Sequence, residues 1–150
     1  MSLNPKPIIN VSRLPAFKDN YLWLIDNEKK AIVVDPGDPK VINEKLKINN
    51  LTLDCILITH HHLDHTGGLK TLIEQHNPIV IGPKSKYIPE IKKEVKHGEI
   101  FKILGITFEV IEVPGHTLDH IAYFASETET TKEPFLFCGD TLFAGGCGRV

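Results

Sequence analysis

The sequence predicts an α/β or α+β domain in which helices cover a mixed β-sheet. Segments typical of strands and helices alternate early in the chain, whereas strand-like segments follow one another later. This order is typical of a mixed sheet with helices packed on it. The 150 residues, of which 41% are hydrophobic and 24% charged, have the composition of one globular domain with its own core. We therefore expect residues 1–150 to form a single domain.

The first half of the chain alternates between strands and helices. Runs rich in β-branched and aromatic residues predict strands, and the polar residues 26–30 predict a hairpin turn. Pro39, followed by the apolar Ile42 and Leu46, predicts a helix that ends near residue 48. The strands expected in this half are residues 8–11, 21–25, 31–35 and 53–60.

The second half of the chain contains mainly strands. We expect a helix over residues 66–75, and glycine and proline mark the breaks between the segments that follow. Residues 84–93 show mixed signals. The strands expected in this half are residues 78–82, 99–104, 106–113, 120–125 and 135–138.

The composition excludes several classes of partner. A net charge of -2 argues against nucleic acid or an anionic membrane as the main partner. No apolar run has the length needed to cross a bilayer, and the N-terminus lacks the apolar core of a signal peptide, which favours a cytoplasmic protein. Cys55, Cys138 and Cys147 form no C-x-x-C pair, so neither a disulfide framework nor a thiolate zinc site is indicated. Cys55 is expected to be a buried apolar residue.

A histidine-rich motif follows one of the predicted strands. Residues 59–65 read Thr-His-His-His-Leu-Asp-His. Side chains alternate in an extended chain, so His60 and His62 face one side while the histidine between them faces the other. Asp64 and His65 follow at the start of the predicted helix and can address a second position nearby. Because imidazole and carboxylate donors without thiolate suit zinc and similar ions in catalytic sites, the motif predicts a metal site.

Three further polar residues follow predicted strands. His116 and Asp140 each lie just beyond a strand, and loops at the strand ends of a rigid sheet commonly carry functional groups. We therefore expect both residues to converge with the histidine-rich motif. Asp35 has two open interpretations: it can accept a hydrogen bond from a metal-bound imidazole, or it can cap the tight turn that follows its strand.

Three motifs make the sequence resemble the metallo-β-lactamase superfamily, whose fold is an αββα sandwich. Residues 59–65 resemble the T-H-x-H-x-D-H signature of that family, residues 114–117 (Pro-Gly-His-Thr) its second metal motif, and residues 139–141 (Gly-Asp-Thr) its third. Within the superfamily, the histidine-rich motif together with residues 139–149 is most similar to the hydroxyacylglutathione hydrolases, also called glyoxalase II. The resemblance spans essentially the whole chain.

The resemblance implies a two-metal hydrolase. By position, His60, His62 and His116 would hold the first metal, Asp64 and His65 the second, and Asp140 would bridge the two. Zinc is the implied metal, with iron or manganese as alternatives. The implied substrate is a small glutathione thioester, S-D-lactoylglutathione, which is cleaved to glutathione and D-lactate by attack of a metal-bound hydroxide that Asp64 and Asp140 orient. Arg149 aligns with a cationic position that contacts the substrate.

The sequence departs from the family pattern near its end. The family supplies a further histidine ligand after Asp140 and a C-terminal helical glutathione-binding domain, and neither is found in this sequence. We therefore expect a truncated catalytic domain with an incomplete second half, one bound metal rather than two, and weak or no activity. An unpaired strand edge would also favour self-association. Two alternatives remain open: a mononuclear iron persulfide dioxygenase that uses His60, His116 and Asp140, or a non-catalytic metal-binding fragment.

Overall fold

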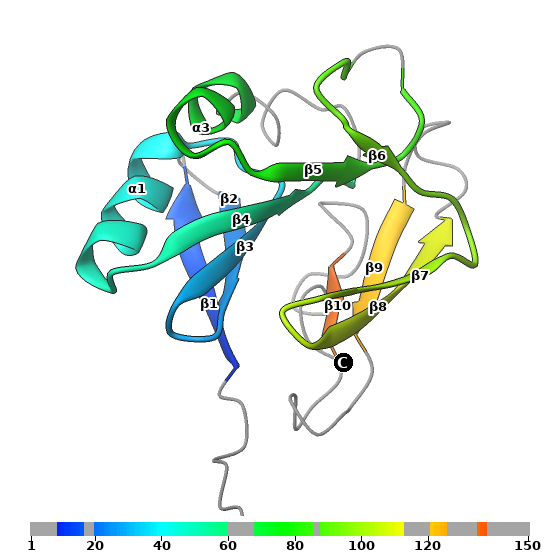
Figure 1. Cartoon of the computed structure of the whole chain (residues 1–150), viewed down its shortest axis with the longest axis horizontal. Coiled ribbons are helices and arrows are strands. Elements are labelled where there is room, and N and C mark those ends of the chain that lie inside the picture. Colours follow the sequence, from blue (N-terminus) through cyan, green and yellow to red (C-terminus); the bar gives the residue numbers. More distant parts are fainter. Residues whose placement is uncertain are drawn as a thin grey trace, which may run out of the picture.

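Two β-sheets packed face to face, with helices on one outer side, form the part of the protein that the structure describes (Figure 1). The structure is a computed structural model and describes residues 9–16, 20–59, 68–85, 88–112, 121–125 and 135–137. No helix in these ranges is long and apolar enough to cross a membrane.

The first sheet mixes antiparallel and parallel pairing. Its strands, in spatial order, are β1 (Asn10–Ala16), β2 (Asn20–Asp26), β3 (Lys30–Val34), β4 (Thr52–Leu57), β5 (Ile79–Gly82) and β6 (Lys93–Glu94). The first three pair antiparallel, whereas β3 to β6 pair in parallel. Helix α1 (Pro39–Ile48) links β3 to β4, and helix α3 (Leu69–His76) lies between β4 and β5 in the chain. The carboxyl ends of β3, β4 and β5 therefore lie at one edge of the sheet.

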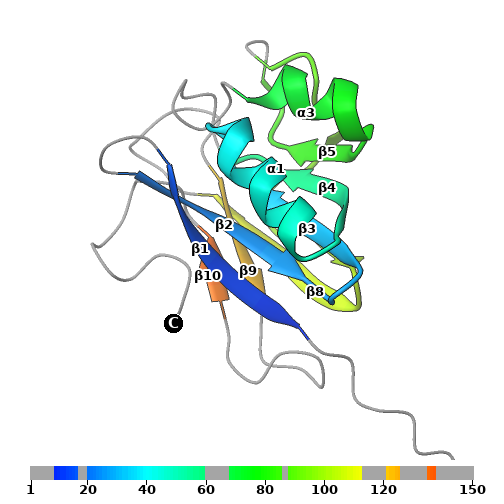
Figure 2. The ribbon, with the colours of Figure 1, turned by 90° about the vertical axis from the view of Figure 1, so that its left-hand side faces the viewer.

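The second sheet is antiparallel in the described ranges. Its strands, in spatial order, are β10 (Phe135–Phe137), β9 (Ile121–Ala125), β8 (Ile106–Glu112) and β7 (Ile100–Ile103). Figure 2 shows the first sheet between the helices on one side and this second sheet on the other. The predicted mixed α/β class is thus confirmed.

Both helices have local signals that fix their ends. Asp38 caps α1 by accepting a hydrogen bond from the Lys40 N–H at 3.0 Å, and Pro39 occupies the first turn, where its missing N–H costs nothing. α3 ends at Asn77, which adopts the left-handed conformation with φ of 50°. Each helix buries one side, through Ile42 and Leu46 in α1 and through Leu69 and Leu72 in α3. The helix predicted from Pro39 is confirmed.

The alternation of side chains along each strand divides the interior into two cores. In β3, Ala31 and Val33 pack toward the helices, whereas Ile32 and Val34 pack toward the second sheet. The second sheet contributes Phe101, Phe108, Val110, Tyr123 and Phe137, among others, to the core between the sheets. Burial of a large apolar side chain contributes about 1.5–3 kcal/mol, so these two cores hold the three layers together.

The structure differs from the sequence-based expectations at three elements. β1 was expected over residues 8–11 but runs from Asn10 to Ala16, because pairing with β2 along its whole length outweighs its polar residues and Pro15, which an edge strand tolerates. β6 begins at the last residue of the segment of mixed signals, residues 84–93, and is only two residues long. The register between β3 and β4 pairs Ala31 with Leu53 but Ile32 with Cys55. Asp54 is therefore an extra residue, and this bulge places Cys55 in the core between the sheets.

Candidate functional site

The end of β4 and the beginning of β9 are joined at one edge of the sandwich. The Ile121 N–H, at the start of β9, donates a hydrogen bond to the carbonyl of Thr59, two residues beyond β4, at 2.9 Å. Ile121 pairs with Glu112 at the end of β8, and Tyr123 pairs with Phe137 at the end of β10. The segments that follow β4, that link β8 to β9 and that follow β10 therefore leave from the same edge.

These three segments contain all the metal ligands predicted from the sequence. The predicted ligands and the predicted substrate contact lie outside the described residues: His60, His62, Asp64 and His65 in residues 60–67, His116 in 113–120, and Asp140 and Arg149 in 138–150. Their positions stay a prediction. Their chemistry, with four imidazoles and two carboxylates, fits zinc or a comparable divalent ion, and the strand ends that flank them lie at one edge. In the described part of the chain, no group of three or more His, Cys, Asp or Glu side chains is placed to hold a metal ion.

Asp35, directly after β3, binds the residue that precedes His60. The Asp35 side chain is 4% exposed, and its Oδ1 accepts the Thr59 N–H at 2.8 Å while its Oδ2 accepts the Thr59 Oγ1–H at 2.6 Å. The Asp35 N–H donates to the Leu57 carbonyl at 2.9 Å. Asp35 has φ of 49°, in the left-handed region that Asp tolerates better than most residues. This conformation and these bonds place its carboxylate at the end of β4.

Neither sequence-based interpretation of Asp35 included the contact with Thr59. Hydrogen bonds to ionised acceptors are short and roughly twice as strong as bonds between neutral groups, and Thr59 is fully buried. The direction in which the chain leaves β4 toward His60 is therefore fixed by the end of the neighbouring strand. The expected contact between Asp35 and a ligand imidazole involves residues outside the described ranges and stays a prediction.

Tyr123 connects the second sheet to the same edge of the first sheet. Its hydroxyl donates to the Ile58 carbonyl at 2.6 Å and lies 3.3 Å from the Ile81 carbonyl, beyond β4 and within β5 respectively. Burial raises the pKa of Tyr123 well above its ordinary value, and repulsion by the Asp35 carboxylate adds to the rise, so the hydroxyl stays protonated and donates. Tyr123 was not among the functional residues predicted from the sequence. The sequence does carry a signal for its role. In the strand β9, Ile121, Tyr123 and Ala125 share the buried face, and a buried tyrosine hydroxyl needs a hydrogen-bond partner.

The far end of the segment that contains the histidine-rich motif is also fixed. The Gly68 N–H donates to the Pro36 carbonyl at 3.1 Å, and a Cβ on Gly68 would lie 2.7 Å from Pro39 Cδ. The absence of a side chain at Gly68 therefore allows close packing against the turn between β3 and α1. Thr59 and Gly68, the described residues on either side of residues 60–67, are therefore both held by residues 35–39.

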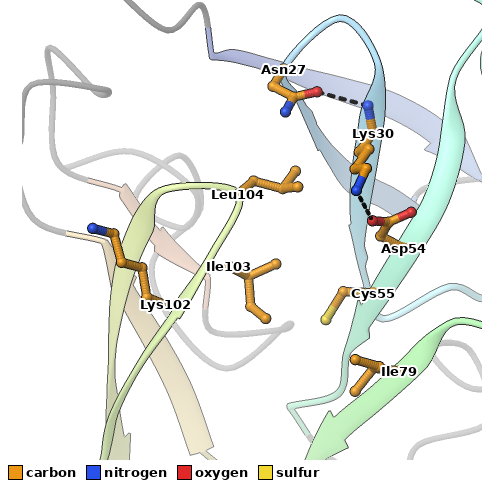
Figure 3. A pocket seen from close by; sticks show the side chains of 8 residues that line it. All are labelled: Asn27, Lys30, Asp54, Cys55, Ile79, Lys102, Ile103 and Leu104. Atoms are coloured by element: carbon orange, nitrogen blue, oxygen red, sulfur yellow. Dashed lines mark hydrogen bonds and ion pairs between the residues drawn. The ribbon is translucent and has the colours of Figure 1, made fainter.

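An open hollow of about 460 Å³ lies at the opposite edge of the sandwich (Figure 3). Its lining includes Cys55, Ile79 and the ion pair between Lys30 Nζ and Asp54 Oδ2 at 3.5 Å. Burial, reinforced by the negative charge of Asp54, raises the pKa of the Cys55 thiol to about 12. The thiolate is therefore absent at neutral pH, and Cys55 cannot serve there as a nucleophile or a ready metal ligand. The expectation that Cys55 is a buried apolar residue is confirmed.

Two other histidines, His76 and His97, lie outside the segments that contain the predicted ligands and form hydrogen bonds of their own. His76 is partly buried at the end of α3, where its Nε2 and Asn43 Oδ1 form a hydrogen bond at 2.8 Å. Burial lowers the pKa of His76 below its ordinary value, which favours the neutral ring in this contact. His97 is exposed, and its Nδ1 accepts a hydrogen bond from the Glu112 N–H at 3.0 Å.

Comparison with known proteins identifies the family of the chain and supports its fold. Residues 17–150 match the family described as the Metallo-beta-lactamase superfamily. A hydroxyacylglutathione hydrolase from Chromohalobacter salexigens is 48% identical over 145 residues, which cover 95% of this chain and 55% of the relative. The crystal structure of ETHE1 from Myxococcus xanthus superposes with a TM-score of 0.73 at 26% identity, covering 93% of this chain and 61% of that one. The BLEG-1 B3 metallo-beta-lactamase shares the fold, with a TM-score of 0.75 at 24% identity, covering 93% and 76% of the two chains.

The chain belongs to the metallo-β-lactamase superfamily. This membership confirms the family resemblance that the three sequence motifs indicated. Hydroxyacylglutathione hydrolases are among its similar relatives, at 45–48% identity. The chain spans about half the length of these curated relatives.

We predict that Thr59→Val weakens the folded state, because it removes the hydroxyl that donates to Asp35 while preserving the shape of the side chain. The free energy of unfolding should fall by about 1.5–3 kcal/mol, the usual contribution of a hydrogen bond to a charged group. Urea unfolding measures the change. Thr52→Val, at an exposed threonine at the start of β4, is the matched control and should stay within about 0.5 kcal/mol of the original protein. Equal effects of the two substitutions would contradict the assigned role of Thr59.

Proposed function

We propose that this chain is the metal-binding part of a thioester hydrolase of the hydroxyacylglutathione hydrolase type. The observation that carries the proposal is the common edge at which the ends of β4, β8 and β10 and the start of β9 lie. Every predicted ligand lies in a segment that leaves from that edge. The relatives at 45–48% identity, which are hydroxyacylglutathione hydrolases, support the substrate class.

The proposed ligands divide between the two metal positions that the family resemblance implies. His60, His62 and His116 would hold the first ion, Asp64 and His65 the second, and Asp140 would contact both. Zinc is the proposed metal, and iron or manganese would fit the same donor types. When bound, such ions activate water at neutral pH and polarise the carbonyl of a substrate.

The residues of the chain have separate tasks in this proposal. Asp64 and Asp140 would orient the attacking water, and Arg149 would attract the anionic glutathione part of the substrate. Asp35 holds the backbone at Thr59, directly before the first ligand. Since a reacting group must be placed closely to be effective, this rigid connection would favour productive alignment.

The first prediction of this proposal concerns metal content. The purified chain, treated with chelator and then dialysed against a small excess of zinc, should retain metal, because three imidazoles suffice to bind one zinc ion. His62→Ala and His116→Ala should each reduce the bound metal measured by elemental analysis. His97→Ala, at an exposed histidine with a backbone contact, is the control and should leave the metal content unchanged. Unchanged metal in both ligand variants would show that these residues are not ligands.

The second prediction concerns the reaction. The protein at its natural length should hydrolyse S-D-lactoylglutathione and leave a chromogenic β-lactam essentially untouched, because the proposed contacts favour an anionic glutathione thioester. Comparison of kcat/KM for the two substrates is the test, and the 150-residue chain is assayed beside it. Higher kcat/KM for the β-lactam would contradict the proposed substrate class. Oxygen uptake with a persulfide substrate and bound iron would instead support the dioxygenase alternative.

A further inference from the structure

Tyr123 forms a directional contact across the core between the two sheets. Most side chains in this core are apolar, and apolar packing is not directional, so it restrains sliding of one sheet over the other only through shape. The Tyr123 hydroxyl, by contrast, donates to the Ile58 carbonyl at 2.6 Å. A hydrogen bond of this length weakens steeply when its distance or angle changes. The contact therefore fixes the position of β9 relative to the end of β4.

A second bond at the same edge makes this restraint more specific. Two residues before Tyr123, the Ile121 N–H donates to the Thr59 carbonyl, the next carbonyl after that of Ile58. The Ile58 N–H in turn donates to the Ile81 carbonyl at 2.8 Å, which ties the end of β4 to β5. Two successive carbonyls thus accept bonds from two positions of β9. These bonds restrain both the separation and the relative rotation of the two strand ends.

The residues of this contact lie close in the sequence to both groups of predicted ligands. Ile58 lies two residues before His60, and Ile121 lies five residues after His116. In the chain, His60, His62 and His65 follow a strand of the first sheet, whereas His116 lies between two strands of the second. A metal site built from both sheets requires its ligands to be held within about 0.5 Å of the productive arrangement. The relative position of the sheets at this edge therefore affects the binding of metal.

We propose that Tyr123 is a positioning residue for the proposed metal centre, and that its hydroxyl sets the separation between Ile58, just beyond β4, and β9. The inference rests on the proposed metal site but assigns a role to a residue that is not a ligand. The hydroxyl stays protonated because burial raises the pKa of Tyr123, so it donates throughout the neutral pH range. Its ring packs edge-to-face against Phe101, with the ring centroids 6.0 Å apart. Tyr123→Phe preserves this ring and removes only the donor.

The experiment measures zinc affinity by competition with a chelator, and ligand geometry by the absorption spectrum of the cobalt(II)-substituted protein. Loss of a residue that orients a metal ligand commonly weakens metal affinity about 10- to 100-fold, and we expect this loss for Tyr123→Phe together with a shifted cobalt spectrum. Ile106→Val is the control, because it removes one methyl group from the same core without touching the hydrogen bond. It should leave affinity and spectrum unchanged.

Each result decides the inference. Unchanged affinity and spectrum in a folded Tyr123→Phe protein would overturn it, as would equal losses in the Ile106→Val control. If Tyr123→Phe does not fold, Tyr123→4-aminophenylalanine and Tyr123→4-methylphenylalanine replace it, since the first keeps a donor and the second keeps only the shape. Restored affinity in the amino variant alone supports the inference, and equal affinity in the two variants refutes it. Failure of the unaltered protein to bind zinc or cobalt would refute the proposed metal site itself.

Discussion

The hydrogen bonds between the Asp35 carboxylate and Thr59 hold together the edge of the sandwich at which β4, β8 and β10 end and β9 begins. They join Asp35, directly after β3, to Thr59, two residues beyond β4, at 2.6 and 2.8 Å, in a buried position. Ile121 then attaches the second sheet to Thr59, and Tyr123 attaches it to the preceding residue, Ile58. A carboxylate is costly to bury unless its oxygens are hydrogen-bonded. Breaking the bonds to Thr59 would leave the buried Asp35 carboxylate with fewer hydrogen bonds, and this cost keeps the two residues in place. The segment that begins at His60 therefore starts from a backbone position fixed by both sheets.

Much of the fold follows from the sequence because its apolar runs and the breaks between them are clear. The continuous apolar run at residues 31–34 is typical of a strand buried on both faces, and the Pro39 start predicts α1. The extension of β1 and the two-residue β6 could not be predicted, since their stability comes from pairing with a neighbouring strand of the sheet rather than from local propensity. The bulge at Asp54 was equally inaccessible. Its effect is visible only when the register of β4 against β3 is known.

For the candidate site, the sequence predicts the ligands but not the residues that support them. The three motifs indicate the family, which the match over residues 17–150 confirms, and they predict the ligand types, because metal-binding side chains at close spacing are a strong local signal. The supporting residues carry no such signal. Tyr123 resembles any apolar residue of a strand in the sequence, and the contact of Asp35 with Thr59 spans 24 positions. Long-range hydrogen bonds of this kind depend on the packing of the sheets, which a single sequence does not reveal.

The most direct test of the account is native-state amide hydrogen exchange of the metal-free protein. If the edge is held from both sheets before any metal binds, the amides of Thr59 and Ile121 should exchange only through global unfolding. Their opening free energies should then equal that of Val33, in the centre of β3. Exchange of Thr59 and Ile121 at the rates of exposed loop amides, while Val33 stays protected, would show that the edge opens by itself and would contradict the central claim.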